Sequence, residues 1–268
     1  MKKIFKIIAI LVAFVLIAGV LFITNAFVGN PISKAIVSDN AKKYVAETYP
    51  NTDYYIDRVG YDFKTGGYYA QVKSPSSIDT YFSVHYNMWG KVGYDNYTSY
   101  VEDRFNTWQR ISSDYRSATD EIINALPYRS DIAFGEIKTL DRGDGDLEFG
   151  LDMTSLELDK EYDLYDLGSK YGEITLYVYV EDISVDAAAE VLLEVKKRFE
   201  NQKQSFYVIN LVLRPDDWEP GVGGESTRIE NFLYEDIIET GIEDKIDAVL
   251  KATQEYYDRM DKQKEQGM

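Results

Sequence analysis

An unbroken apolar run from Ile7 to Ile23 constrains this chain more than any other feature of its sequence. An α-helix rises about 1.5 Å per residue, so about 20 residues cross a hydrocarbon core about 30 Å thick. The run has 17 residues and reaches that length with its apolar flanks. Only a helix can cross alone, because its backbone polar groups bond to one another. The residues expected to anchor the chain in lipid include Ile7, Leu11, Phe14, Leu21 and Ile23.

The charge around this run predicts its orientation. Lys2, Lys3 and Lys6 precede it, and no acidic residue occurs before Asp39. Because flanking lysines are retained on the cytoplasmic side, we expect a cytoplasmic N-terminus and a single pass through the cell membrane. The bulk of the chain would then be extracytoplasmic. The N-terminal helix would have the lipid bilayer as its partner.

Two other interpretations of the run stay open. A cleaved signal peptide has the same positive start, but its apolar stretch is usually about 7–15 residues long and ends at a small-residue site. Here the run is longer, and the best cleavage candidate, Thr24-Asn25-Ala26, is a poor match. The other alternative is a helix in the core of a soluble protein. The chain has no cysteine, so lipoprotein processing is excluded.

Composition indicates folded domains with an acidic surface. The chain is 45% hydrophobic and 14% aromatic, which is enough to build cores. Its formal net charge is −17, or −20 without the three leading lysines. Such a surface repels phosphate groups, so nucleic acid is not expected as a partner, and peripheral binding to anionic lipid is disfavoured. The absence of cysteine excludes a disulfide framework.

The region after the anchor begins with a helix over residues 32–48 and a period-two pattern typical of strands. Turns at residues 64–67 and 75–77 separate the strands of an antiparallel meander, and the last strand is expected near residues 91–94. A long helix over residues 96–126 follows, with apolar side chains recurring every seven positions. We expect this helix to pack on the preceding sheet, and a coiled coil is the alternative.

The remainder predicts a second sheet with helices. We expect strands over residues 131–140, 174–180, 206–213 and 228–234, with a hairpin turn at residues 141–146 and a return strand after it. The acidic stretch 156–168 is expected to be a loop. A helix starting near Ser184 permits a parallel crossover between two of the strands, and a final helix covers residues 243–260.

These elements predict an α+β protein: an N-terminal transmembrane helix followed by two small domains, each a mostly antiparallel sheet packed with helices. The expected divisions are residues 1–28 for the anchor with its short cytoplasmic tail, 30–127 for the first domain and 128–268 for the second.

Few residue patterns indicate catalytic chemistry. One histidine, His85, and no cysteine exclude His/Cys zinc sites and thiol catalysis, and no phosphate-binding or dinucleotide-binding motif occurs. We therefore predict no catalytic residue and no cofactor. Asp141, Asp144 and Asp146 crowd one turn and form a weak candidate for calcium, although a solvated hairpin turn explains them better.

Tyrosine is the most unusual part of the composition. Of 23 tyrosines, 14 lie between Tyr44 and Tyr128. Tyrosine has a flat apolar ring and a polar tip, which suits binding surfaces, so Tyr54, Tyr69 and Tyr81 are candidates to line the open face of the first sheet. Tyrosine is also a good strand former at a half-wet surface, which is the simpler explanation.

Three features of the sequence carry a family resemblance: the lysine-led anchor, the junction from Asn25-Ala26-Phe27 to Gly29-Asn30-Pro31-Ile32-Ser33-Lys34, and the helix end Tyr44-Val45-Ala46-Glu47-Thr48-Tyr49-Pro50. In these features the chain resembles the YfjL-like family of membrane-anchored bacillus proteins. It implies a Gram-positive source and a two-part exterior. It implies no particular activity and no functional residue.

Together these features favour a non-catalytic surface module that binds an envelope protein, a peptide or a glycan. Two alternatives stay open. One is an envelope hydrolase using paired carboxylates or calcium, which requires a cleft with facing acids or a cation site. The other is a structural or assembly protein of the cell envelope.

Overall fold

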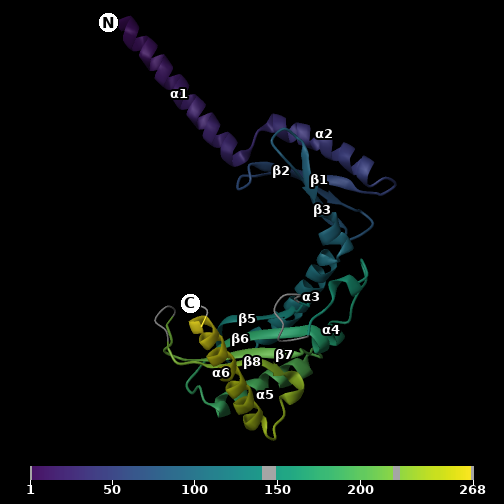
Figure 1. The fold of residues 1–268 in the computed structure, drawn as a ribbon, viewed down its shortest axis with the longest axis vertical. Helices are drawn as coiled ribbons and strands as arrows, with labels where there is room; N and C mark the ends of the chain where they lie inside the picture. The colour runs from purple at the N-terminus through teal and green to yellow at the C-terminus, as the bar shows by residue number, and fades with distance from the viewer. Residues whose placement is uncertain (1, 141–148, 220–223, 267–268) are drawn as a thin grey trace. The chain divides into compact units, whose positions relative to one another are not determined.

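The computed structural model describes residues 2–140, 149–219 and 224–266 (Figure 1). The chain divides into two compact units. The first unit comprises the residues up to Thr107 together with residues 157–159, and the second comprises residues 108–156 and those from Lys160 onward. Each unit has its own sheet and its own apolar core.

The first helix, α1 (Lys2–Val28), carries the apolar run. The large apolar side chains that the structure describes on this helix are exposed, and Phe14 is 70% exposed. Among the described residues, this N-terminal stretch alone is long and apolar enough to cross a membrane, a test that a signal sequence also passes. Ile7, Leu11 and Ile23 are exposed in the same way, while the side chain of Leu21 lies outside the described part.

The first sheet is the expected antiparallel meander. It consists of β1 (Tyr55–Asp62), β2 (Gly67–Lys73), β3 (Tyr81–Tyr86) and β4 (Val92–Asp95), paired in that order. Side chains of β2 and β3 alternate between buried and half-buried, because successive strand residues point to opposite faces. The buried face packs on α2 (Pro31–Thr48) through Val37, Ala41 and Val45.

The Asp95 carboxylate links α2 to the edge strand β4 of this sheet. Tyr44 and Tyr49 each donate a hydroxyl hydrogen bond to Asp95 Oδ2, at 2.6 and 2.7 Å, and the Tyr97 amide donates to Oδ1. Burial, and then the bond to this carboxylate, raises the pKa of the Tyr49 hydroxyl. The hydroxyl therefore stays a donor at every ordinary pH.

Replacing Asp95 with alanine is expected to lower the free energy of unfolding of the first unit by about 3–6 kcal/mol, because it removes two tyrosine hydrogen bonds to a charged acceptor and each such bond contributes about 1.5–3 kcal/mol. Hydrogen exchange of the β2 and β3 amides measures this loss within the unit. The matched control is Asp39→Ala, which removes an exposed acid that forms an ion pair with Lys42. The control should cost less than about 0.5 kcal/mol, and equal effects of the two variants would contradict the prediction.

The second unit holds a mixed sheet of order β5-β6-β7-β8. β6 and β7 run parallel and are joined through α5, while the two outer pairs are antiparallel. Its elements are α3 (Phe105–Asn124), β5 (Arg129–Ile137), α4 (Leu164–Tyr171), β6 (Gly172–Val180), α5 (Val185–Asn201), β7 (Val208–Pro215), β8 (Thr227–Leu233) and α6 (Ile242–Gln266). Short helical turns lie at Thr98–Glu102, Met153–Ser155 and Tyr234–Asp236. The predicted α+β class with two antiparallel-rich sheets is confirmed.

In the second unit, the backbone of α4 at Gly168 lies very close to the backbone at Ser205. The Tyr115 ring is fully buried, and its hydroxyl donates to the Ser205 carbonyl at 2.8 Å. Gly168 lies against both residues, and a Cβ there would come within 2.3 Å of the Ser205 oxygen. Only glycine fits at this position of α4. The contacts of Tyr115, Gly168 and Ser205 therefore hold α3, α4 and the segment before β7 together.

The single helix expected over residues 96–126 is wrong, and the two structural units divide at residue 107 rather than after residue 127. A separate turn at Thr98–Glu102 precedes α3, and Arg104 between them has φ +65°. From Trp108 onward α3 belongs to the second unit, because Ile111, Tyr115 and Ile122 are buried in its core rather than on the first sheet.

Two further expectations differ from the structure. The acidic stretch 156–168 is not all loop, because α4 begins within it and Asp163 caps α4 by accepting from the Tyr165 and Asp166 amides. The strand expected over residues 131–140 ends at Ile137 in the structure and pairs with β6. The predicted turn at residues 141–146 lies outside the described residues, and Leu151 beyond it makes an isolated bridge to Thr139.

Candidate functional site

The open face of the first sheet carries a row of aromatic side chains. We call Arg58, Tyr69, His85 and Tyr94 the aromatic row. Tyr69 and His85 are register partners on β2 and β3, and His85 and Tyr94 are partners on β3 and β4. The His85 and Tyr94 rings stack with centroids 4.5 Å apart at 13°, and the Arg58 guanidinium lies 5.9 Å from the Tyr69 ring centre. Three ring-bearing strands and a cation thus form one platform.

A glycine on β1 shapes one end of this platform. Gly60 is the register partner of Tyr69, and a Cβ at Gly60 would stand 2.3 Å from Tyr69 Cζ. The tyrosine ring therefore lies across the bare backbone of β1. Any larger residue at this position would push the ring away from the strand.

His85 is neutral within the row at neutral pH. Burial of its ring lowers its pKa below the ordinary value, and the nearby Asp62 carboxylate opposes this shift only in part. A neutral imidazole keeps an apolar face for stacking. The row consequently offers three aromatic rings and the guanidinium of Arg58 to a ligand.

A shallow hollow of about 470 Å³ adjoins the row where two hairpin turns meet. His85 and Tyr94 form part of its wall, and Met88 and Trp89 from the β3–β4 turn form another part. Trp89 is 78% exposed. The β1–β2 turn, including Asp62 and Thr65, completes the rim. This end of the sheet combines rings, a thioether and backbone polar groups, which is the usual lining of a binding site.

The structure separates the three tyrosines that the sequence suggested. Tyr69 and Tyr81 lie on the open face, with Tyr81 opposite Lys73 at the far end of β3. Tyr54 precedes β1 and instead joins an aromatic cluster beside the buried core, where its hydroxyl lies 3.4 Å from that of Tyr97. His85 and Tyr94 were not among the suggested residues, although strict alternation along β3 puts His85 on the same face as Tyr81.

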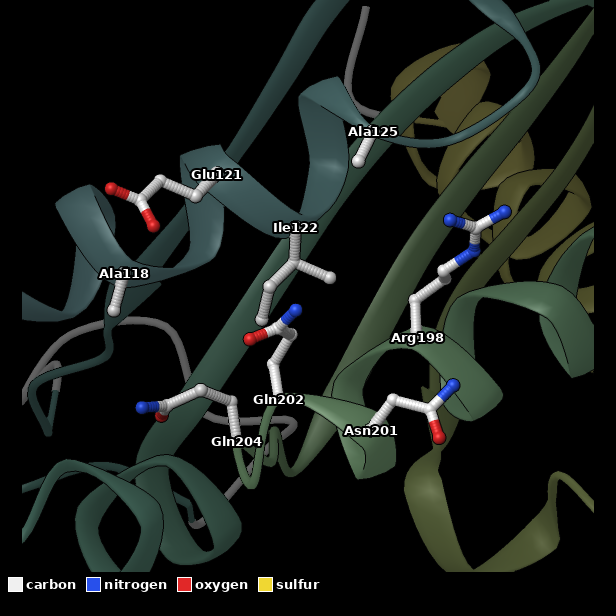
Figure 2. Close-up of a pocket in the computed structure, with 8 residues that line it drawn as sticks. All are labelled: Ala118, Glu121, Ile122, Ala125, Arg198, Asn201, Gln202 and Gln204. Atoms are coloured by element: carbon white, nitrogen blue, oxygen red, sulfur yellow. The ribbon is translucent and has the colours of Figure 1, made fainter.

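A second hollow, of about 370 Å³, lies in the second unit between the C-terminal halves of α3 and α5 (Figure 2). Amide side chains dominate its α5 side, and Arg198 is held by a 2.6 Å contact with Glu194. Glu121 is the one carboxylate among the lining residues. Facing acids, which carboxylate hydrolysis needs, are not present among the residues that line this hollow.

The candidate calcium ligands Asp141, Asp144 and Asp146 lie outside the described residues. Within the described part, no group of three His, Cys, Asp or Glu side chains could hold a metal ion. In the acidic stretch 156–168, Asp159 accepts hydrogen bonds from other residues of the protein. Asp159 accepts from the Ser77 hydroxyl and the Asp79 amide in the first unit.

Comparison with known families gives one match for each structural unit. Residues 2–96 match the YfjL-like N-terminal domain, and residues 114–247 match the YfjL-like C-terminal domain. The interval between the matches contains the boundary between the two units at residue 107. No curated protein and no solved structure matches the chain.

Proposed function

The chain belongs to the YfjL-like family, and from this starting point we propose that it is a membrane-anchored, non-catalytic binding module. In this proposal α1 stays in the cell membrane with its lysine-led end in the cytoplasm, and both units lie outside. The aromatic row then binds an envelope protein, a peptide or a glycan.

The observation that carries the proposal is the continuity of the row across three strands. Tyr94 is 61% exposed although it stacks on His85, so one ring face is packed and the other is free for a ligand. Exposed rings gathered in this way are typical of recognition surfaces. The guanidinium of Arg58 adds a donor for a carboxylate, a carbonyl or a sugar hydroxyl.

The test uses the full chain in its native membrane, with a photoreactive benzoylphenylalanine in place of Tyr94. We expect light-dependent adducts with one envelope component, and we expect Gly60→Ala to reduce them strongly because its Cβ displaces the Tyr69 ring. The matched control carries the photoreactive residue at Tyr165, a tyrosine of the second unit that is 49% exposed.

Equal adducts at both positions, or adducts that are unaffected by Gly60→Ala, would overturn the binding role of the row. Digestion of the adducts with protease and with wall-degrading enzymes assigns the partner to peptide or glycan. Release of a cleaved envelope product by the wild-type chain would overturn the non-catalytic part of the proposal and favour the hydrolase alternative.

A further inference from the structure

We propose that the two hairpin turns at one end of the first sheet seat that unit on the outer surface of the membrane that α1 enters. We define the membrane seat as residues 62–67 and 87–91. The inference rests on the anchoring part of the proposed function. It adds a second, lipid-facing interaction surface that is distinct from the anchor itself.

The first step concerns how firmly the end of α1 is held to the sheet. The Asn30 amide donates to the Tyr68 hydroxyl at 2.6 Å, and this hydroxyl lies 3.2 Å from the Asn30 carbonyl. Gly29, with φ +78°, lies so close to the Tyr61 ring that a Cβ would stand 2.6 Å from it. Two strand tyrosines thus hold the junction, and no free linker separates helix and sheet.

The second step is the length of the helix. Twenty residues counted from Ile7 span about 30 Å and reach Ala26, so Ala26 lies where the hydrocarbon ends. The Tyr61 hydroxyl donates to the Ala26 carbonyl at 3.1 Å, and the Phe63 ring centre lies 6.2 Å from that of Phe27. The β1–β2 turn is therefore fixed at the boundary between acyl chains and head groups.

The third step concerns the side chains that this end of the sheet leaves uncovered. Phe63 is 57% exposed, Met88 52% and Trp89 78%. The two turns lie side by side, because both line the same hollow, and the Asn40 side chain holds the β3–β4 turn to α2 by donating to the Gly90 carbonyl at 2.8 Å. Tryptophan and other aromatic rings prefer this boundary layer of a bilayer.

The fourth step is local charge. The chain as a whole is strongly acidic, and we expected it to avoid anionic lipid. The local charge at the junction and the two turns is positive instead. Residues 29–36, 62–67 and 87–91 contain three lysines, Lys34, Lys64 and Lys91, but one acid, Asp62. All three lysines are exposed. Lysines beside an apolar surface can place their stems against acyl chains and their charges among phosphates.

The chain contains no cysteine, so single cysteines can be labelled without background. We would label Trp89→Cys, Phe63→Cys and Val15→Cys with a fluorescent maleimide. Each full-length protein is reconstituted in vesicles of equimolar phosphatidylcholine and phosphatidylglycerol that contain acyl-brominated lipid. The matched control is Ile78→Cys, because Ile78 is 67% exposed and lies in the turn between β2 and β3, at the opposite end of the same sheet.

We expect probes at residues 63 and 89 to lose most of their emission to brominated lipid, as the probe at residue 15 does, while the probe at residue 78 keeps nearly all of it. Equal emission at residues 89 and 78, with residue 15 quenched, would overturn the membrane seat but leave the anchor intact. An unquenched probe at residue 15 would overturn the anchor itself. Cross-linking of residue 89 to its counterpart in a second chain, without quenching, would assign the turns to a protein contact and overturn the seat.

Charge is tested separately with Lys64→Gln/Lys91→Gln in the Trp89→Cys background. Quenching should fall in vesicles containing phosphatidylglycerol and stay unchanged in pure phosphatidylcholine, because only the anionic head groups attract the lysines. An equal fall in both kinds of vesicle would overturn the role of the two charges.

Discussion

Replacing Phe206 with alanine is expected to lower the free energy of unfolding of the second unit by about 3–5 kcal/mol. The Phe206 ring is fully buried and meets Phe199 edge to face, with centroids 4.9 Å apart at 84°. It meets Tyr234 in the same way at 4.9 Å and 89°. Such aromatic pairs contribute about 0.5–1.5 kcal/mol beyond the burial of their area, so the loss should fall in the upper part of the range. A domain of this size has only about 5–15 kcal/mol in total.

Chemical denaturation of the full chain in detergent measures this effect if each unit has its own probe. In a Trp89→Phe background, Trp108 and Trp218 report on the second unit, and a label on Ile78→Cys reports on the first. The tryptophan midpoint should fall steeply, and the label midpoint should stay in place because the two cores are separate. The exposed control Tyr165→Ala should change the stability by less than about 0.5 kcal/mol. A joint fall of both midpoints would show that the units unfold together.

Local patterns predicted the elements well where one face of an element is buried. The alternation in β2 and β3 appears in the structure without a slip. The apolar side chains of α5, including Ala188, Leu192 and Phe199, recur at helical spacing and are all buried. In both cases the period of the sequence matches the geometry of the element, and burial of that face is its main source of stability.

The partner of an amphipathic helix was not predictable in the same way. The stripe on α3 shows that one face is buried, but it carries no information about which sheet covers it. Val101 enters the first core and Ile111 the second, and the left-handed residue Arg104 between them ends the preceding helical turn. The helix α4 was missed for another reason, since it has only eight residues and begins within an acidic stretch.

The candidate site was predicted only in part, because its geometry depends on register. The positions of Tyr69 and Tyr81 on the open face follow from alternation along their strands. Stacking of His85 on Tyr94 depends on the β3–β4 register, which pairs these two residues and which no single-strand pattern shows. Tyr54 stands outside a strand, so alternation does not apply to it. The acceptor Asp95 lies 51 residues from Tyr44 in the sequence, and only the folded meander brings the two together.

Introducing arginine at both Phe14 and Leu16 is expected to abolish membrane insertion of the chain. Thirteen residues between Ile7 and Ile23 are isoleucine, leucine, valine or phenylalanine. At about −0.3 to −0.6 kcal/mol each they favour insertion by roughly −4 to −8 kcal/mol. Two central arginines add about 5–7 kcal/mol and remove two of the favourable residues, so the sum rises to about zero or above.

Alkaline extraction of membranes measures the result, and sequencing of the mature N-terminus separates an anchor from a signal peptide. The wild-type chain should resist extraction and keep its N-terminal residues, whereas the double arginine variant should be found outside the membrane fraction. The control Phe14→Leu/Leu16→Phe keeps both positions apolar and should behave like the wild type. A wild-type chain that starts near Phe27 and appears in the medium would contradict anchoring. The membrane seat would then lose its basis, because its position follows from an α1 that stays in the bilayer and from the bonds that Tyr61 and Tyr68 make at the end of α1.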